Sequence, residues 1–324
     1  MRNAFLTVEA ATALIEDGAI VFISGPEALL RQLPTGTWIG GTTGYFMTEE
    51  GGVSRQDRLF CTVFDEALGA KTAILPSDGL TELVAGRFRH GFACIVAPAF
   101  STAHRRYAIE GPGLPGLYNQ PVFGWVAGVH LDRIGVDTPR IFDGATGVMA
   151  DEGLAVLWID LPEDVEVDLD IVNLFTMGDG DEIAFPETGF EATDCIVNGE
   201  RINFARYVTE KGLDTRLPLV ADYAGAMINA SFQSVDPEAG HVRFYAPVVV
   251  GTSYRLARAV PDYASAYAEA AGGRNAAEML SCNCILNYLH AGLEGNPTGG
   301  FVGPVTFGEF AYILMNQTLS RLSI

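Results

Sequence analysis

The chain has 324 residues, of which 48% are hydrophobic and 19% are charged, and this length suits one large domain or two of ordinary size. Its 20 Lys and Arg residues are outnumbered by 40 Asp and Glu residues, so the formal net charge is −20. A surface this acidic repels nucleic-acid phosphates and anionic lipids, and we therefore expect neither a nucleic acid nor a membrane as a partner.

The first third of the chain alternates between helices and buried strands. Thr7 is placed to cap a helix that ends near Gly18, and the apolar run 19–23 then has the length of a buried strand. The elements expected next are a helix at 26–33, a glycine-interrupted strand at 37–46, a strand at 58–64, a helix at 80–90, a strand at 92–96 and a helix that begins at Ser101. This alternation predicts an α/β layer.

The middle of the chain is richer in strands, and a second domain is expected after it. Strands are expected within 121–129, 140–148, 154–161 and 190–208. Asn198 and Gly199 predict a two-residue hairpin turn. The pattern restarts near 212–218, which divides the chain into domains of residues 1–215 and 216–324.

Two helices are expected near the C-terminus. One covers 263–271 and is capped by Asp262, and the other covers 310–322, where apolar residues recur at helical spacing. Together these elements predict a two-lobed α/β protein with mixed β-sheets and flanking helices.

The segment around Cys282 and Cys284 is compatible with either a helix or a strand. Apolar residues recur at helical spacing from Met279 to Leu293. A helix would point the two thiols about 200° apart, whereas a strand would place both on one face, where they would reach the same ligand.

The cysteines and the N-terminus indicate the compartment. Residues 1–6 lack the apolar core of a signal peptide, and no apolar run approaches the roughly 20 residues that span a bilayer. The five cysteines, which lie mostly in apolar strings, are Cys61, Cys94, Cys195, Cys282 and Cys284. We expect a cytoplasmic protein with buried free thiols and no disulfide.

Two Gly-rich segments, 40–46 and 299–303, resemble each other. Two loops of this kind, one in each lobe, would face each other across a cleft. The alternative is a pair of unrelated strands with close backbone contacts.

Several short motifs occur in the order typical of one known family. They are Gly40-Gly41-Thr42-Thr43-Gly44, Gly251 to Leu256 with Arg255, Ser281-Cys282, Glu294, Gly300-Phe301-Val302-Gly303 and Gly308-Glu309. This order covers most of the chain and resembles the FIST sensory domains of bacterial signal transduction. The family usually has an arginine shortly after the cysteine, where this chain has Asn283 and Cys284, so the chain resembles a divergent member.

The resemblance implies a cytoplasmic sensory protein that binds a small ligand in a cleft and acts on a separate signalling partner. It also favours a strand up to Cys284 and a helix from Ile285. The implied ligand-binding residues are Gly40, Gly41, Thr42, Thr43, Arg255, Cys282, Glu294, Gly300, Phe301 and Glu309. The threonines would offer hydroxyl and N–H groups, Arg255 would bind a carboxylate, Glu309 would bind an amine or order its loop, and the glycines would let the backbone approach the ligand.

Two alternatives remain open. Some FIST proteins are haem-based sensors of a gas such as nitric oxide, and here His290 or Cys282 would be the axial ligand. A small-molecule enzyme would instead use Cys282 as its nucleophile, with its pKa lowered by the helix that begins at Ile285. The chain has no G-x-S-x-G, G-x-x-x-x-G-K-[ST] or H-E-x-x-H motif, so we expect no metal site other than haem and leave the cofactor unassigned.

Overall fold

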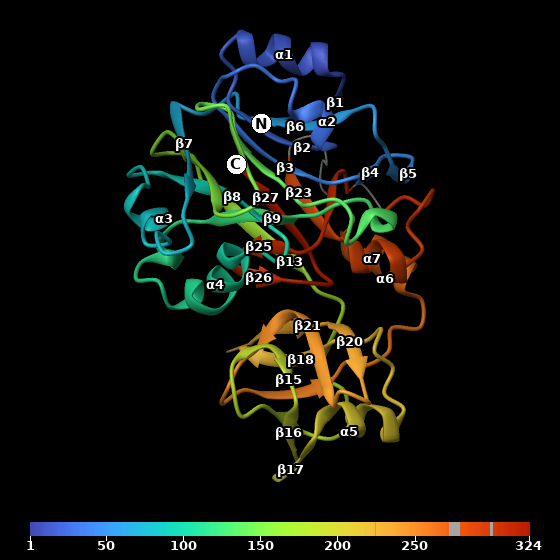
Figure 1. Ribbon diagram of the computed structural model, residues 1–324. Coiled ribbons are helices and arrows are strands. Elements are labelled where there is room, and N and C mark those ends of the chain that lie inside the picture. Colours follow the sequence, from blue (N-terminus) through green and yellow to red (C-terminus); the bar gives the residue numbers. More distant parts are fainter. Residues whose placement is uncertain (224, 272–278, 299–300) are drawn as a thin grey trace.

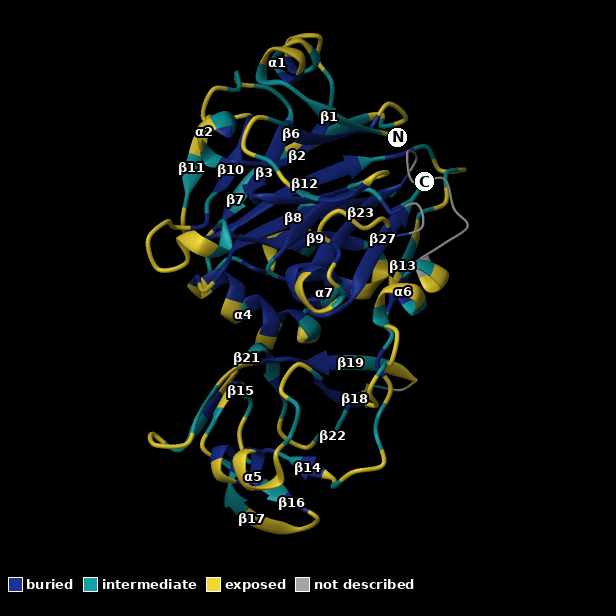
Figure 2. Cartoon of the chain, turned by 90° about the vertical axis from the view of Figure 1, so that its right-hand side faces the viewer, coloured by how far each residue is buried: buried dark blue, intermediate teal, exposed yellow. Residues whose placement is uncertain are grey.

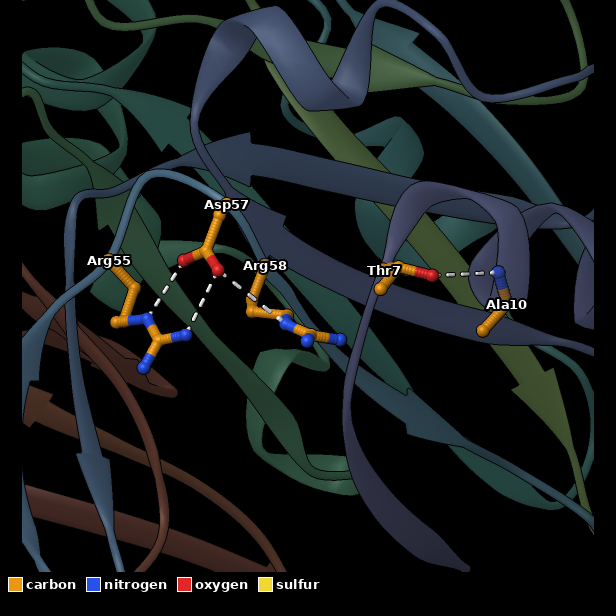
Figure 3. Close-up of polar contacts among 5 residues, drawn as sticks. All are labelled: Thr7, Ala10, Arg55, Asp57 and Arg58. Carbon is orange, nitrogen blue, oxygen red and sulfur yellow. Dashed lines mark hydrogen bonds and ion pairs between the residues drawn. The ribbon is translucent and has the colours of Figure 1, made fainter.

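The computed structural model describes residues 1–223, 225–271, 279–298 and 301–324 (Figure 1). Its N-terminal segment begins as the sequence predicts. Thr7 Oγ1 accepts a hydrogen bond from the backbone N–H of Ala10 at 3.3 Å and so caps the first helix, α1 (Val8–Glu16) (Figure 3). The buried strand β2 (Val21–Gly25) follows α1, runs parallel to β3 (Trp38–Thr42) and is joined to it through the short helix α2 (Glu27–Leu30).

Three parts of the chain repeat one order of elements, and we call them units 1, 2 and 3. Unit 1 contains β1 (Arg2–Leu6), α1, β2, α2, β3, β4 (Tyr45–Thr48), β5 (Gly51–Ser54) and β6 (Leu59–Val63). Unit 2 contains β7 (Gly69–Leu75), α3 (Glu82–Ala85), β8 (Gly91–Pro98), α4 (Thr102–Glu110), β9 (Val122–Ala127), β10 (Ile141–Asp143), β11 (Val148–Ala150) and β12 (Leu154–Asp160). Unit 3 contains β13 (Asp168–Val172), α6 (Tyr263–Ala271), β23 (Leu280–Cys284), α7 (Ile285–His290), β24 (Gly303–Thr306), β25 (Glu309–Ala311), β26 (Ile313–Met315) and β27 (Leu319–Ser323).

The three sheets built from these units also share one pairing pattern. Sheet 1 has the order β1-β6-β2-β3-β10-β11, sheet 2 has β7-β12-β8-β9-β25-β26, and sheet 3 has β13-β27-β23-β24-β4-β5. In each sheet the third and fourth strands are parallel. All other neighbours are antiparallel. The described residues of units 1, 2 and 3, which together we call the larger body, therefore form a threefold repeat in their topology.

Each sheet receives its last two strands from another unit. The hairpin β10–β11 of unit 2 completes sheet 1, and the hairpin β25–β26 of unit 3 completes sheet 2. The hairpin β4–β5 of unit 1 completes sheet 3. The exchange runs in one direction and closes a ring, so backbone hydrogen bonds join the three units.

The three sheets also share one hydrophobic core. Phe22 of β2 stacks on Trp125 of β9 with ring centroids 4.0 Å apart, and Leu280 and Leu322 of sheet 3 belong to the same cluster. Figure 2 shows strands that are buried along most of their length, with exposed residues on the helices and loops. Strands buried on both faces are apolar throughout, which explains the continuous apolar runs of the sequence.

One glycine in the second parallel strand of each unit faces a backbone carbonyl of its neighbour. A Cβ added to Gly40, Gly124 or Gly303 would lie 2.7, 1.8 or 2.5 Å, respectively, from a carbonyl oxygen of the adjacent strand. The close approach that these glycines permit is therefore between strands. Gly41 serves the packing of sheet 1 on sheet 2, because its Cβ would lie 2.5 Å from Val96 Cγ1.

The smaller body, residues 183–256, is inserted into unit 3 between β13 and α6 (Figure 1). Its elements are β14 (Ile183–Ala184), β15 (Gly189–Ala192), β16 (Asp194–Val197), β17 (Glu200–Asn203), α5 (Phe204–Lys211), β18 (Leu219–Tyr223), β19 (Ala226–Ala230), β20 (Phe232–Asp236), β21 (His241–Val248) and β22 (Ser253–Leu256). They form a six-stranded and a three-stranded sheet around a core of their own. The hairpin predicted at Asn198 and Gly199 is confirmed, and both residues have positive φ between β16 and β17.

The predicted α/β class with mixed sheets and flanking helices is confirmed, but the sheets do not divide at residues 215 and 216. In the smaller body, β14 lies before that position and pairs with β22 after it. In the larger body, β4 pairs with β24. The chain leaves the larger body after β13 and returns to it at α6.

Two predicted helices are wrong or too long. Residues 310–322 form strands instead of a helix, because the chain turns at Tyr312 and Gln317, both of which have positive φ, and so forms the separate strands β25, β26 and β27. The helix expected at 80–90 is reduced to α3. In contrast, the strand to Cys284 and the helix from Ile285 are confirmed as β23 and α7. Among the described helices, none has the length and apolar character needed to cross a membrane.

Candidate functional site

Three equivalent crevices lie at the carboxyl ends of the parallel strand pairs. In register, Gly25 of β2 lies beside Thr42 of β3, Pro98 of β8 beside Ala127 of β9, and Cys284 of β23 beside Thr306 of β24. In open α/β sheets, ligands bind outside the carboxyl ends of the strands. We call the three positions crevices 1, 2 and 3, after their units.

Crevice 1 is an open cavity of about 600 Å³. It is lined by the segments that follow β2, β3 and β9, together with the loop after β5. The lining residues are Pro26, Glu27, Ala28, Arg31, Thr42, Thr43, Gly44, Ser54, Gln56, Gly128, Val129, His130, Arg133, Asp137 and Thr138. The cavity thus contains the two threonines predicted from the sequence.

The threonine hydroxyls also hold the walls of crevice 1 together. Thr42 Oγ1 accepts a hydrogen bond from the backbone N–H of Arg140 at 3.0 Å, which leaves its own hydrogen free to donate. Thr43 Oγ1 donates to the carbonyl oxygen of Val305 in β24 and thereby joins unit 1 to unit 3. Of the two, Thr42 has the donor available for a ligand.

His130 and Gln56 are the polar side chains beside Gly44. An added Cβ at Gly44 would lie 3.1 Å from Gln56 Nε2 and 3.6 Å from the His130 ring. The backbone N–H of Asp132 donates to His130 Nδ1 at 3.3 Å, so the neutral imidazole carries its proton on Nε2. Within the described chain, neither His130 Nε2 nor Gln56 Nε2 has a hydrogen-bond partner.

Gln56 and His130 each have charged or aromatic neighbours. Gln56 lies between Arg55 and Asp57, whose side chains form two hydrogen bonds of 2.8 and 3.0 Å (Figure 3). Asp57 also lies 3.7 Å from Arg58. His130 stacks on Tyr45, with ring centroids 5.0 Å apart.

The charged groups of crevice 1 are already paired. Arg31 lies 2.6 Å from Glu27, and Arg133 lies 2.7 Å from Asp137. These four side chains balance in charge, and each arginine has further N–H groups for a ligand. The cavity therefore presents hydrogen-bond donors without a large net charge.

Crevice 2 is nearly filled by the smaller body. Only about 20 Å³ remain where Phe190 and Tyr245 of the smaller body meet Phe100 and His104 of unit 2. Burial lowers the pKa of His104 to about 4, so this side chain is neutral at neutral pH. Crevice 2 has no room for a ligand.

Crevice 3 is filled by the chain's own polar side chains. Glu309 is fully buried, and Thr318 Oγ1 donates to its Oε2 at 2.9 Å. The carbonyl oxygen of Thr318 accepts from the backbone N–H of Cys284 at 3.3 Å, and Cys282 Sγ lies 3.0 Å from Thr306 Oγ1. Cys282 and Glu309, both expected to line the ligand cleft, are fully enclosed by protein.

The electrostatics of crevice 3 oppose a resting thiolate. Burial raises the pKa of Glu309 well above its usual value, which favours the neutral acid. Burial, and then the nearby Glu309, raise the pKa of both Cys282 and Cys284. The lowered pKa expected for a nucleophilic Cys282 is therefore wrong.

The structure does not gather the other predicted site residues around crevice 1. Arg255 lies in the smaller body and donates to the carbonyl oxygen of Gly180 at 3.1 Å. Glu294 is exposed beside Gly52, and Phe301 is buried in an apolar cluster. Gly300 lies outside the described residues.

The two haem candidates lie apart. Cys282 is fully buried in the core that the three sheets share. His290 ends α7 and lines a cavity of about 570 Å³ between the two bodies. Partial desolvation at this cavity and the nearby Arg216 lower the pKa of His290.

Sequence reasoning missed His130 and Gln56. His130 lies three residues beyond β9, on the segment of unit 2 equivalent to the one that carries Thr43 in unit 1, so a recognised repeat would have pointed to this segment. The repeat is in the strand order, however, and the sequence around Gly128 does not resemble that around Thr42. Gln56 sits in a charged loop with no motif of its own.

A comparison with protein families gives one match. The model described as "Family of unknown function (DUF6976)" matches residues 6–324. Neither the curated proteins nor the solved structures contain a significant match. Because the family match spans nearly all of the chain, this protein belongs to the DUF6976 family.

Proposed function

We propose that this chain is a ligand-binding protein and that crevice 1 takes a small polar molecule rich in hydrogen-bond acceptors. In line with the FIST resemblance, the bound state would act on a separate signalling partner in the cytoplasm. The signalling role rests on the resemblance alone, whereas the binding site rests on the geometry of crevice 1.

The observation that carries the proposal is the difference between the three crevices. Crevices 2 and 3 are closed by the smaller body or by the chain's own side chains, and crevice 1 has about 600 Å³ of space. Donors of unit 1 and unit 2 converge there: Thr42 Oγ1, Gln56 Nε2 and His130 Nε2. Oxygen acceptors such as those of a carboxylate or an amide fit these donors.

Mass spectrometry of small molecules released from the purified protein tests the proposal. We expect one polar compound to bind again to the stripped protein and to raise its melting temperature. His130→Ala and Gln56→Ala should each weaken that binding about tenfold, because each removes one hydrogen bond to the ligand. Gln56→Ala should change folding little. His130→Ala also removes the stacking on Tyr45 and the hydrogen bond from Asp132, so the melting temperature of the unliganded variants is measured as well.

His241→Ala is the matched control. His241 lines a cavity of the smaller body, far from crevice 1 in the fold, and its loss should leave binding unchanged. Equal affinity in the wild type and the crevice variants would contradict the site. A Soret band in the absorbance spectrum of the same preparation would instead support the haem alternative.

A further inference from the structure

Crevice 3 has a thiol at the end of its first parallel strand. Cys284 is the last residue of β23 and pairs with Thr306, just as Gly25 ends β2 and pairs with Thr42. The chain then enters α7, as it enters α2 in unit 1. Cys284 therefore stands at the carboxyl end of its parallel pair, the edge at which ligands bind in open α/β sheets.

Glu309 gives this thiol an acid–base partner. Its Oε2 accepts from Thr318, while its Oε1 has no nitrogen or oxygen hydrogen-bond partner among the described residues, although the carboxyl group is fully buried. A buried polar atom without such a partner requires an explanation, and one explanation is a function in another state of the site. Thr318 links the two residues, because its carbonyl oxygen also accepts from the backbone N–H of Cys284 at 3.3 Å.

A single turn, residues 316–318, covers Cys284 and is held by the smaller body. The backbone N–H of Cys284 donates to the carbonyl oxygen of Thr318 at 3.3 Å. On its other side the turn meets Ser231, whose Oγ donates to Asn316 Oδ1 at 2.6 Å and also to Gln317 Oε1. Gln317 Nε2 donates to the carbonyl oxygen of Arg216 in the smaller body at 3.0 Å. Polar interfaces of this kind permit relative movement of two bodies.

The cavity between the bodies already reaches the edge of this cover. Gln317 and Tyr263 line that cavity of about 570 Å³. Tyr263 Oη donates to Asn287 Oδ1, and Asn287 Nδ2 donates to the carbonyl oxygen of Thr318 at 2.9 Å. A small displacement of the turn would therefore join the cavity to crevice 3.

We propose that Cys284, with Glu309 as its proton acceptor, is a reactive-thiol site for small uncharged electrophiles, exposed when the smaller body moves off the turn 316–318. The groups that face Cys284 are Glu309, Cys282, Tyr245, Tyr263 and Tyr267. Burial raises the pKa of each of these groups and so favours its uncharged form, which leaves the closed site without a counter-ion for a charged reagent. In the closed state the thiol is inert, and water that enters on opening restores an ordinary thiol acidity.

Iodoacetamide is a suitable probe because it is small and uncharged. Water that enters on opening lets Glu309 ionise. The Cys284 thiol then gives its proton to the Glu309 carboxylate, its sulfur bonds to the methylene carbon, and the carbon–iodine bond breaks to release iodide. The proton then passes from Glu309 to water. Peptide mass spectrometry after timed exposure of the full chain gives the rate at each cysteine.

We expect Cys284 to react at least tenfold faster than Cys61 and Cys94, which are buried in the larger body. Low concentrations of urea should hardly change the Cys284 rate, because a local opening exposes little surface. Equal rates at the three cysteines, rising steeply and together with urea, would mean that only global unfolding exposes Cys284 and would overturn the proposal.

Two variants test the parts of the proposal separately. Ser231→Ala removes the hydroxyl's hydrogen bonds to the turn, while the bonds from the backbone N–H of Ser231 and from Asn229 Nδ2 to Asn316 remain. This loosening should speed the reaction at Cys284 about tenfold while Cys94 is unchanged. Ser234→Ala, an exposed serine of β20, is the matched control and should have no effect. Glu309→Gln should slow the reaction at Cys284, because glutamine accepts no proton. An unchanged Cys284 rate in Ser231→Ala would contradict the role of the turn 316–318 as the cover of Cys284. An unchanged rate in Glu309→Gln would contradict the role of Glu309 as proton acceptor.

Discussion

Replacement of Gly124 by alanine is expected to destabilise the protein by about 4 kcal/mol or more, the range reached when a core clash cannot relax. Gly124 lies in β9, and its added Cβ would be 1.8 Å from the carbonyl oxygen of Ile95 in β8. Both strands lie inside sheet 2, so relief requires the parallel pair to separate. The midpoint of urea unfolding measures the loss.

Gly69→Ala is the control for this prediction. Gly69 begins β7, and a Cβ there would meet no atom within 4 Å. Its replacement should change the free energy of unfolding by less than about 0.5 kcal/mol. If Gly124→Ala unfolded at the same urea concentration as Gly69→Ala, the close contact between β8 and β9 would be refuted.

Glu309→Gln is expected to remove a marked pH dependence of stability. Burial raises the pKa of Glu309, so above pH 4.5 or so the unfolded chain releases a proton that the folded chain keeps. Stability from this group is fully present at lower pH and is lost as the pH rises toward the folded-state pKa, at up to about 1.4 kcal/mol per pH unit. Glutamine does not ionise, so the variant should gain stability over the wild type as the pH rises from 5 to 8.

The difference in unfolding free energy between the wild type and Glu309→Gln reports on the ionisation of Glu309 alone. The pKa values of His104 and His290 are lowered by burial, so stability from these groups rises with pH, but equally in both proteins. Glu294→Gln removes a carboxyl group that is already exposed to water and serves as the control. Parallel stability curves for the wild type and Glu309→Gln would mean that Glu309 ionises in the folded protein as it does in the unfolded chain.

Local patterns predicted the parts of the fold that depend on nearby residues. The cap at Thr7, the hairpin at Asn198 and the change from strand to helix after Cys284 each depend on a few adjacent residues. The terminal strands were missed because a segment buried on both faces is apolar at every spacing, including the helical one. Only the turns at Tyr312 and Gln317 distinguish three short strands from one helix here, and neither residue is typical of positive φ.

The candidate site was predicted in part for a similar reason. Thr42 and Thr43 follow a glycine-rich strand, which is a visible signal, and they do line crevice 1. His130 and Gln56 reach the same cavity through the pairing of strands from two units, which no local pattern records. The insertion of residues 183–256 also hid the repeat, because it separates β13 from the rest of unit 3.

The exchanged hairpins set an order of events during synthesis on the ribosome. Tyr45 to Met47 pair with Gly303 to Val305, so the hairpin of unit 1 has no sheet to join until the last strands of the chain have emerged. Until then the apolar residues Phe46 and Met47, fully buried in the finished fold, remain without their partners. Pairings this distant in sequence form slowly and leave strand edges exposed to association in the meantime. The nascent chain is therefore expected to depend on chaperones until unit 3 is complete.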